Sequence, residues 1–276
     1  MTNCDEIIHG SDVAEVWAML FARAMEPGCD HLGPTMVRIR TDDARQMVES
    51  DSPVRSAIDA VLRAAGSPRV RETASLIFPY SPWRAKLSDI DALTTWYVGE
   101  FMPRLKVIAP SQFRHTYFER MVDFDGTGMS DSSGNNQLKF ILDRCAETSE
   151  RRTHFRQSGL QVSIFDPRRD HTRSAQKNFP CLQQLGFYFL EDGSLGLSAY
   201  YPTQVIVERA YGNYLGLCQL GVFMAHQLDV PFREFVCFVG SPRLNFKKKD
   251  LRELESRLLE LRLEIDTRHT PDVTVS

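Results

Sequence analysis

The sequence lacks long hydrophobic runs, paired cysteines and an excess of basic residues. No apolar stretch approaches the roughly 18 residues of a membrane-spanning helix, and the first residues are acidic, unlike a signal peptide. The six cysteines show no CxxC spacing, which argues against a zinc knuckle or a disulfide scaffold. A net charge of -3 at pH 7 argues against a general nucleic-acid binder. We therefore expect a cytoplasmic protein without a membrane or nucleic-acid partner and without a metal site.

The residues that are present have an ordinary globular composition. Hydrophobic residues make up 42% and charged residues 25% of the 276 positions, which is enough chain to bury a sizeable core. No internal repeat and no linker divides the sequence. We therefore expect one domain over residues 1–276.

Hydrophobic periodicity predicts the secondary structure. Helices are expected, with Ser11 as the cap of the first one, at about residues 11–25, 53–65, 89–104, 136–147, 212–228 and 248–264. Strands are expected at residues 35–40, 160–165, 182–190, 195–207 and 233–239, and a strand or extended segment is expected at residues 73–80. Helices come first and strands cluster late without regular alternation, which predicts an α+β fold around one mixed sheet.

Two segments carry residue types suited to chemistry. Cys181 directly follows a proline at the start of an aromatic strand, and Asn213 lies at the glycine-bounded start of an apolar helix. A thiolate is a good nucleophile, and a carboxamide hydrogen-bonds the amide edge of a flat ring. The alternative is that Cys181 is a buried core thiol, which is common for cysteine. Residue types alone leave both interpretations open.

These segments resemble the thymidylate synthase and pyrimidine hydroxymethylase superfamily, of which the chain would be a divergent member. Residues 179–183 (Phe-Pro-Cys-Leu-Gln) resemble its nucleophile strand, and residues 211–217 resemble the helix start that carries its pyrimidine-reading Asn. The turn around Tyr117 resembles the family's Tyr-x-x-Arg turn, and Glu100 matches its water-organising glutamate. The resemblance covers about residues 90–245 and implies a thymidylate synthase-like fold, a mixed twisted sheet with flanking helices.

The resemblance breaks down where the family binds phosphate. Its Arg-Ser-x-Asp segment corresponds to Pro-Thr-Gln-Val here, so only the hydroxyl of Thr203 remains. Arg151 and Arg152 match the adjacent arginines that the family lends from its partner subunit. Arg243 replaces a sugar-contacting residue and would reach a phosphate or the thiol; the alternative is a surface arginine in a loop.

The resemblance implies a homodimer that transfers one carbon from 5,10-methylenetetrahydrofolate to C5 of a pyrimidine nucleotide or related base. Cys181 would form the adduct at C6, Asn213 would bind the ring, and Tyr117 and Glu100 would move protons. The product would be a methyl or a hydroxymethyl group. Loss of the phosphate-binding arginine favours an alternative, a catalytically silent binding or partner protein. The base, the sugar and the presence of a phosphate stay open.

Overall fold

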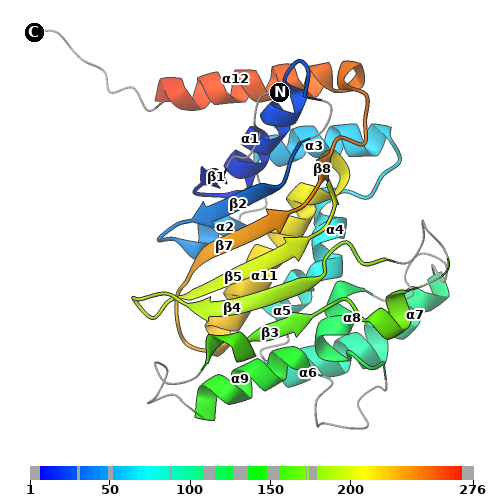
Figure 1. Cartoon of the computed structure of the whole chain (residues 1–276), viewed down its shortest axis with the longest axis vertical. Coiled ribbons are helices and arrows are strands. Elements are labelled where there is room, and N and C mark those ends of the chain that lie inside the picture. Colours follow the sequence, from blue (N-terminus) through cyan, green and yellow to red (C-terminus); the bar gives the residue numbers. More distant parts are fainter. Residues whose placement is uncertain are drawn as a thin grey trace, which may run out of the picture.

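A six-stranded mixed sheet forms the centre of the protein (Figure 1). The computed structural model describes residues 7–29, 32–48, 52–86, 89–108, 116–126, 136–147, 156–171, 173 and 179–268. The strands lie in the order β1-β2-β7-β5-β4-β3. Their bounds are Ile7–Gly10 (β1), Thr35–Arg40 (β2), Gln161–Ser163 (β3), Gln184–Phe189 (β4), Leu195–Tyr201 (β5) and Phe232–Val239 (β7). β1 pairs parallel with β2 and β5 parallel with β7, whereas the other pairs are antiparallel.

Helices flank this sheet. Their bounds are Val13–Met25 (α1), Ala44–Val48 (α2), Pro53–Ala64 (α3), Val70–Ile77 (α4), Tyr80–Lys86 (α5), Ile90–Trp96 (α6), Met102–Ile108 (α7), Tyr117–Val122 (α8), Gln137–Glu147 (α9), Pro167–Asp170 (α10), Tyr211–Gln227 (α11) and Arg252–Arg268 (α12). Two π-helical turns, η1 (Tyr97–Phe101) and η4 (Ile206–Ala210), join α6 to α7 and lead into α11. A short parallel pair, β6 (Gln204–Val205) and β8 (Pro242–Arg243), lies beyond the end of β5.

Helix α11 is the centre of the core. It lies behind β5 and β7 in Figure 1 and is buried on nearly every side, as expected for a helix between a sheet and another helix layer. Two of its glycines allow α4 to approach closely. A Cβ on Gly212 would lie 2.6 Å from the Cβ of Thr73, and one on Gly216 would lie 2.7 Å from the carbonyl oxygen of Ala74. This contact fixes the start of α11 against α4.

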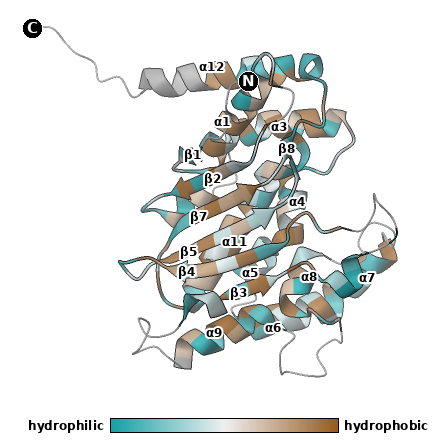
Figure 2. Cartoon of the chain, viewed as in Figure 1, coloured by the Kyte–Doolittle hydropathy of each residue, from teal (hydrophilic) through white to brown (hydrophobic). Residues whose placement is uncertain are grey.

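Among the described helices, none covers the opposite face of the sheet (Figure 1). In β2, Val37 and Ile39 are buried on the helix side while Arg38 and Arg40 are on the other face. Figure 2 shows hydrophobic residues along the central strands and hydrophilic residues gathered on α7, at the edge of the molecule. Within the described ranges, no helix combines the length and apolarity needed to cross a bilayer.

The predicted α+β class with one mixed sheet and flanking helices is confirmed. The six predicted helices form, with boundaries shifted by a few residues, although a π-helical turn interrupts the one expected at residues 89–104. The predicted strands at 35–40, 160–165, 182–190 and 233–239 also form, with some ends shortened.

Three local predictions are wrong. Residues 73–80 form the end of α4 and the start of α5 rather than a strand, because Val70, Ala74 and Ile77 bury one helical face against α11. The strand expected to reach residue 207 ends at Tyr201, and the chain is helical from residue 206. The cap of α1 is Asp12, not Ser11, because the Asp12 side chain accepts the backbone N–H of residue 15.

Candidate active site

Cys181 lies three residues before β4 and is exposed at the surface. The backbone N–H of Gln183 donates to the carbonyl of Tyr200 at 3.0 Å, so sheet pairing begins two residues after the cysteine. Cys181 is exposed, whereas Cys218 and Cys237 are buried. Cys181 is therefore not a core thiol. Protein atoms still surround its sulfur enough that burial raises the pKa of the thiol above its ordinary value.

The structure brings Tyr117 beside Cys181. Tyr117 is the first residue of α8, and the helix cap Thr116 shares a hydrogen bond of 2.8 Å with the hydroxyl of Tyr97 in η1. The backbone N–H of Leu182 donates to the Tyr117 hydroxyl at 3.5 Å. Burial, with the neighbouring Cys181 as a smaller cause, raises the pKa of Tyr117 to about 12. The phenol is thus protonated at neutral pH and is available as a hydrogen-bond donor.

Thr203 reaches the thiol from the other strand of the hairpin. β4 and β5 are antiparallel, with Gln184 opposite Tyr200, so residues just after β5 lie across from residues just before β4. The Thr203 hydroxyl is in hydrogen-bonding reach of the Cys181 thiol and lowers its pKa, which offsets part of the larger effect of burial. The Thr203 hydroxyl, which is what remains here of the resembled family's phosphate-binding segment, therefore contacts the candidate nucleophile.

Arg209 is a site residue that the sequence patterns did not predict. It lies in η4, and its positive charge lowers the pKa of both Cys181 and Tyr117. Its Nη1 donates to the hydroxyl of Thr73 at 3.5 Å. Because the sequence pattern predicts a strand through residue 207, it does not indicate that Arg209 belongs to the site. A helical interpretation of that segment would have placed Arg209 one turn before Asn213, on the same side of the helix.

Asn213 is a buried amide near the start of α11. Only 5% of the residue is exposed. Asn213 follows Arg209 by four residues, across the junction of the π-helical turn η4 and α11. No described contact joins Asn213 to the thiol, so its place beside Cys181 stays a prediction.

A layer of buried polar groups lies behind these residues. The hydroxyl of Tyr214 donates to Oε1 of Gln204 at 2.7 Å, while Nε2 of Gln204 and the hydroxyl of Tyr201 have no partner among the described residues. Cys181 and Tyr117 contribute to raising the pKa of Tyr201, for which burial is the main cause. The buried residues next to the site are therefore polar rather than apolar.

Other predicted site residues lie elsewhere or outside the described part. Glu100 is exposed on η1 and pairs with Arg104 at 3.5 Å, and no described contact joins it to the thiol. Arg243 is exposed on β8, and its Nε donates to the hydroxyl of Ser241 at 3.4 Å. Arg151 and Arg152 lie outside the described residues. The proposed roles of these four residues stay predictions.

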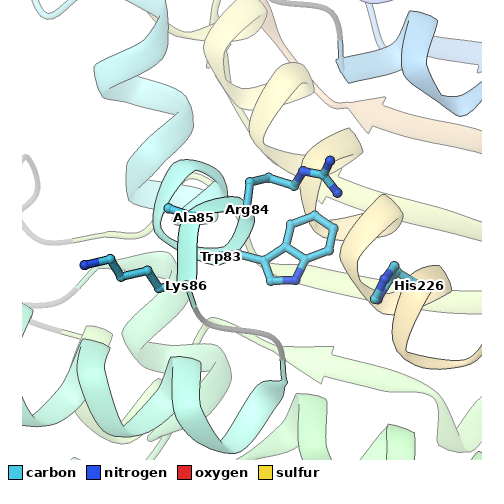
Figure 3. A pocket seen from close by; sticks show the side chains of 5 residues that line it. All are labelled: Trp83, Arg84, Ala85, Lys86 and His226. Atoms are coloured by element: carbon cyan, nitrogen blue, oxygen red, sulfur yellow. The ribbon is translucent and has the colours of Figure 1, made fainter.

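One hollow lies apart from this cluster, between α5 and the C-terminal end of α11 (Figure 3). Its volume is about 330 Å³, and two of the residues that line it, Trp83 and His226, are in edge-on ring contact with their centroids 5.5 Å apart. Arg84 stacks on the Trp83 ring, and Lys86 points away from the indole. None of its lining residues belongs to the Cys181 cluster. No group of His, Cys, Asp and Glu suited to a metal occurs within the described segments.

Comparison with known proteins gives likenesses to solved structures alone. No family profile and no curated protein matches the sequence. Among solved structures, the chain is similar to thymidylate synthase from T4 phage, with a TM-score of 0.48 and 14% identity. The superposition covers 87% of this chain and 79% of the phage enzyme. A likeness this loose carries no argument about activity. Function must therefore be inferred from the geometry around Cys181.

Proposed function

We propose that the protein transfers one carbon to C5 of a pyrimidine nucleotide or related base, through a covalent adduct between Cys181 and C6 of the ring. The observation that carries the proposal is the grouping around one exposed thiol. Tyr117, Thr203 and Arg209 each act on the thiol or on its neighbouring backbone, and a buried amide, Asn213, follows Arg209 by four residues.

The thiol supplies the nucleophile. Once deprotonated, Cys181 forms an S–C6 bond, and the electrons of the C5–C6 double bond move through C4 to its oxygen, which makes C5 nucleophilic. After C5 has taken up the one-carbon unit, the C5 proton passes to water and the carrier would depart, which leaves an exocyclic methylene group on the ring. Hydride from the carrier, or water, then adds to this carbon, the C5–C6 double bond forms again, and the S–C6 bond breaks and returns the thiolate. Arg209 and Thr203 favour the charged sulfur, since both lower the pKa of the thiol.

Asn213 and Tyr117 stabilise the ring. A carboxamide offers both a donor and an acceptor, which fits the adjacent O4 and N3 positions of a pyrimidine. Tyr117 keeps its proton at neutral pH, so its hydroxyl donates a hydrogen bond to negative charge that develops near the thiol.

We propose 5,10-methylenetetrahydrofolate as the one-carbon donor. Phe179, two residues before the nucleophile, is 45% exposed and gives a flat carrier an aromatic surface for stacking. The residues therefore fit such a carrier on this side of the site. When bound, the folate supplies a carbon at the oxidation level of formaldehyde. Whether the product is a methyl or a hydroxymethyl group stays a prediction of the resemblance.

We also propose that two copies of the chain pair through the uncovered face of the sheet. Tyr200 of β5 and Phe238 of β7 stack at 5.8 Å there, with 42% and 39% of each residue exposed. A stacked aromatic pair on a helix-free sheet face is a typical centre for an interface. In such a dimer the partner would supply further arginines, for which Arg151 and Arg152 are the sequence candidates.

Release of tritium from C5 tests the reaction. Uridine and cytidine nucleotides, in ribose and deoxyribose forms and labelled at C5, are incubated with the protein with and without 5,10-methylenetetrahydrofolate. We expect release that is lost in Cys181→Ser and reduced in Asn213→Ala, while the control Cys29→Ser keeps it. Release that persists in Cys181→Ser would contradict the mechanism.

The second candidate is a catalytically silent protein that binds a ligand in this site. The observations that favour it are Pro202 in place of the family's arginine and a thiol pKa raised by burial rather than lowered. Both functions predict ligand binding that depends on Asn213. Binding of a labelled nucleotide without tritium release under any condition would select the silent protein.

A further inference from the structure

The hollow between α5 and the end of α11 is lined by cationic and aromatic side chains (Figure 3). Its volume of about 330 Å³ is at the lower end of the range for small-molecule sites. The residues that line it are Trp83, Arg84, Ala85, Lys86 and His226. Two of them carry a permanent positive charge, one carries an imidazole, and none carries a carboxylate. The lining therefore favours a negatively charged occupant.

Arg84 and Lys86 have charges that the described residues do not balance. In the part of the chain that the structure describes, no carboxylate forms an ion pair with either side chain. An exposed arginine elsewhere does find such a partner, since Arg257 pairs with Glu260 at 2.8 Å. A guanidinium without a carboxylate partner keeps its fork of N–H donors for the oxygens of an anion.

The indole of Trp83 holds Arg84 in place. The guanidinium lies over the ring, 5.5 Å from its centroid. The ring itself is fixed, because Trp83 is 5% exposed and meets Phe78 and Phe223 edge-on at centroid distances of 5.9 and 5.3 Å. A cation–π contact restricts the arginine without using its hydrogen-bond donors. Less side-chain freedom is then lost when an anion binds.

His226 adds a donor from the last turn of α11. An imidazole donates a hydrogen bond from one ring nitrogen in either neutral tautomer. The carbonyls of Met224, Ala225 and His226 accept from the backbone N–H groups of residues 228–230, at 3.0–3.3 Å. These carbonyls are therefore satisfied within the protein. The two full positive charges of the lining exceed the roughly half negative charge of a helix end.

We propose that this hollow is a second ligand site, which binds a small organic anion through its phosphate or carboxylate groups. Arg84 is the main binding residue, and His226 donates a further hydrogen bond. The site is separate from the candidate active site, since its lining includes no residue of the Cys181 cluster. His226 also lies thirteen residues after Asn213, about 20 Å along the axis of α11. The inference therefore does not depend on the proposed reaction.

Modification of His226 by diethyl pyrocarbonate tests the site in the full chain. The rate at His226 is followed by peptide mass spectrometry at constant pH and ionic strength, in titrations with sodium phosphate, glycerol 3-phosphate and citrate against sodium chloride. We expect saturable slowing by at least one of the three oxyanions and none by chloride. The oxyanion that acts at the lowest concentration tells whether phosphate or carboxylate groups are preferred. His9, which is exposed on β1, should react at an unchanged rate.

Arg84→Gln is expected to raise the anion concentration for half-maximal protection about tenfold or more, the usual effect of losing a hydrogen bond to a charged group. Arg257→Gln removes an exposed arginine of α12 and should leave the protection unchanged. Binding also raises the melting temperature of the wild type, and this rise should shrink in Arg84→Gln. Protection that is equal at His9 and His226, that chloride reproduces, or that survives Arg84→Gln unchanged would overturn the proposal, as would no protection by any of the three oxyanions.

Discussion

Arg120 and Asp170 form a buried bidentate ion pair, in which Nη1 and Nη2 of the arginine lie 2.6 and 2.7 Å from the two carboxylate oxygens. Nη1 also donates to the carbonyl of Ile164 at 2.7 Å. The pair ties α8, which begins with Tyr117, to α10 in the segment that leads toward Cys181. It therefore helps to hold the tyrosine near the thiol without touching either group.

Asp170→Asn is expected to destabilise the protein by roughly 3–5 kcal/mol, because it leaves the charge of Arg120 buried without its partner. The hydrogen bonds from Arg120 hold the pKa of Asp170 below 3.8 in the folded protein despite its burial. Its contribution is therefore complete above that ordinary value and is lost as the pH falls through the lower folded value. Urea unfolding at pH 7 and between pH 5 and 2 measures both effects.

The exposed pair Arg257–Glu260, at 2.8 Å on α12, provides the control for this prediction. Glu260→Gln is expected to cost less than about 1 kcal/mol, since solvent screens exposed ion pairs. Equal losses in the two variants would show that burial does not distinguish the pairs.

Gly212→Ala should destabilise the protein and lower activity together. The new methyl group would meet the Cβ of Thr73 at 2.6 Å and the carbonyl oxygen of Val70 at 2.9 Å, so α4 and α11 must separate. Overpacking of this kind costs about 1–3 kcal/mol, and Gly212 directly precedes Asn213. Thermal unfolding and tritium release measure the two consequences.

Gly99→Ala is the matched control for Gly212→Ala. A Cβ at Gly99, in η1, meets no atom within 4 Å, so alanine should leave stability unchanged or raise it by up to about 1 kcal/mol through its helix propensity. If Gly212→Ala behaved like Gly99→Ala, the close contact between α4 and α11 would not be a constraint.

Thr203→Val should slow alkylation of Cys181 at fixed pH. The Thr203 hydroxyl lowers the pKa of the thiol, so its removal raises the pKa and reduces the thiolate fraction. The pH profile of alkylation is therefore expected to move to higher pH. Thr203→Ser keeps the hydroxyl and should keep the wild-type profile; a shift of equal size in both variants would mean that packing rather than hydrogen bonding is responsible.

Tyr200→Glu is expected to convert the proposed dimer to monomers, because it places a charge at the centre of the uncovered sheet face. Sedimentation velocity over a range of protein concentrations measures the change. Leu259→Glu alters a residue of α12 that is 58% exposed and should leave the assembly intact. A wild-type protein that sediments as a monomer at all concentrations would rule out the pairing.

Local sequence patterns determined most of the sheet. The segment from residue 182 to 201 alternates around a turn at Gly193, whose φ of 80° suits glycine, and it forms the β4–β5 hairpin. This hairpin places Cys181 and Thr203 across from each other, because strand pairing fixes which residues are neighbours. The proximity of these two residues therefore follows from short-range pattern and register.

Contacts between segments that are far apart in the sequence decided the conformation of residues 73–77 and of the segment that starts at residue 206. Residues 73–77 contain β-branched and apolar residues that favour a strand, but packing of Thr73 and Ala74 against the glycines of α11 makes them helical. The same packing supports η4, where the chain turns helical at residue 206 and brings Arg209 to the thiol. The sequence thus determined the nucleophile and its strand. Only the tertiary structure decided which cation reaches the nucleophile, since that depends on how tightly two helices pack.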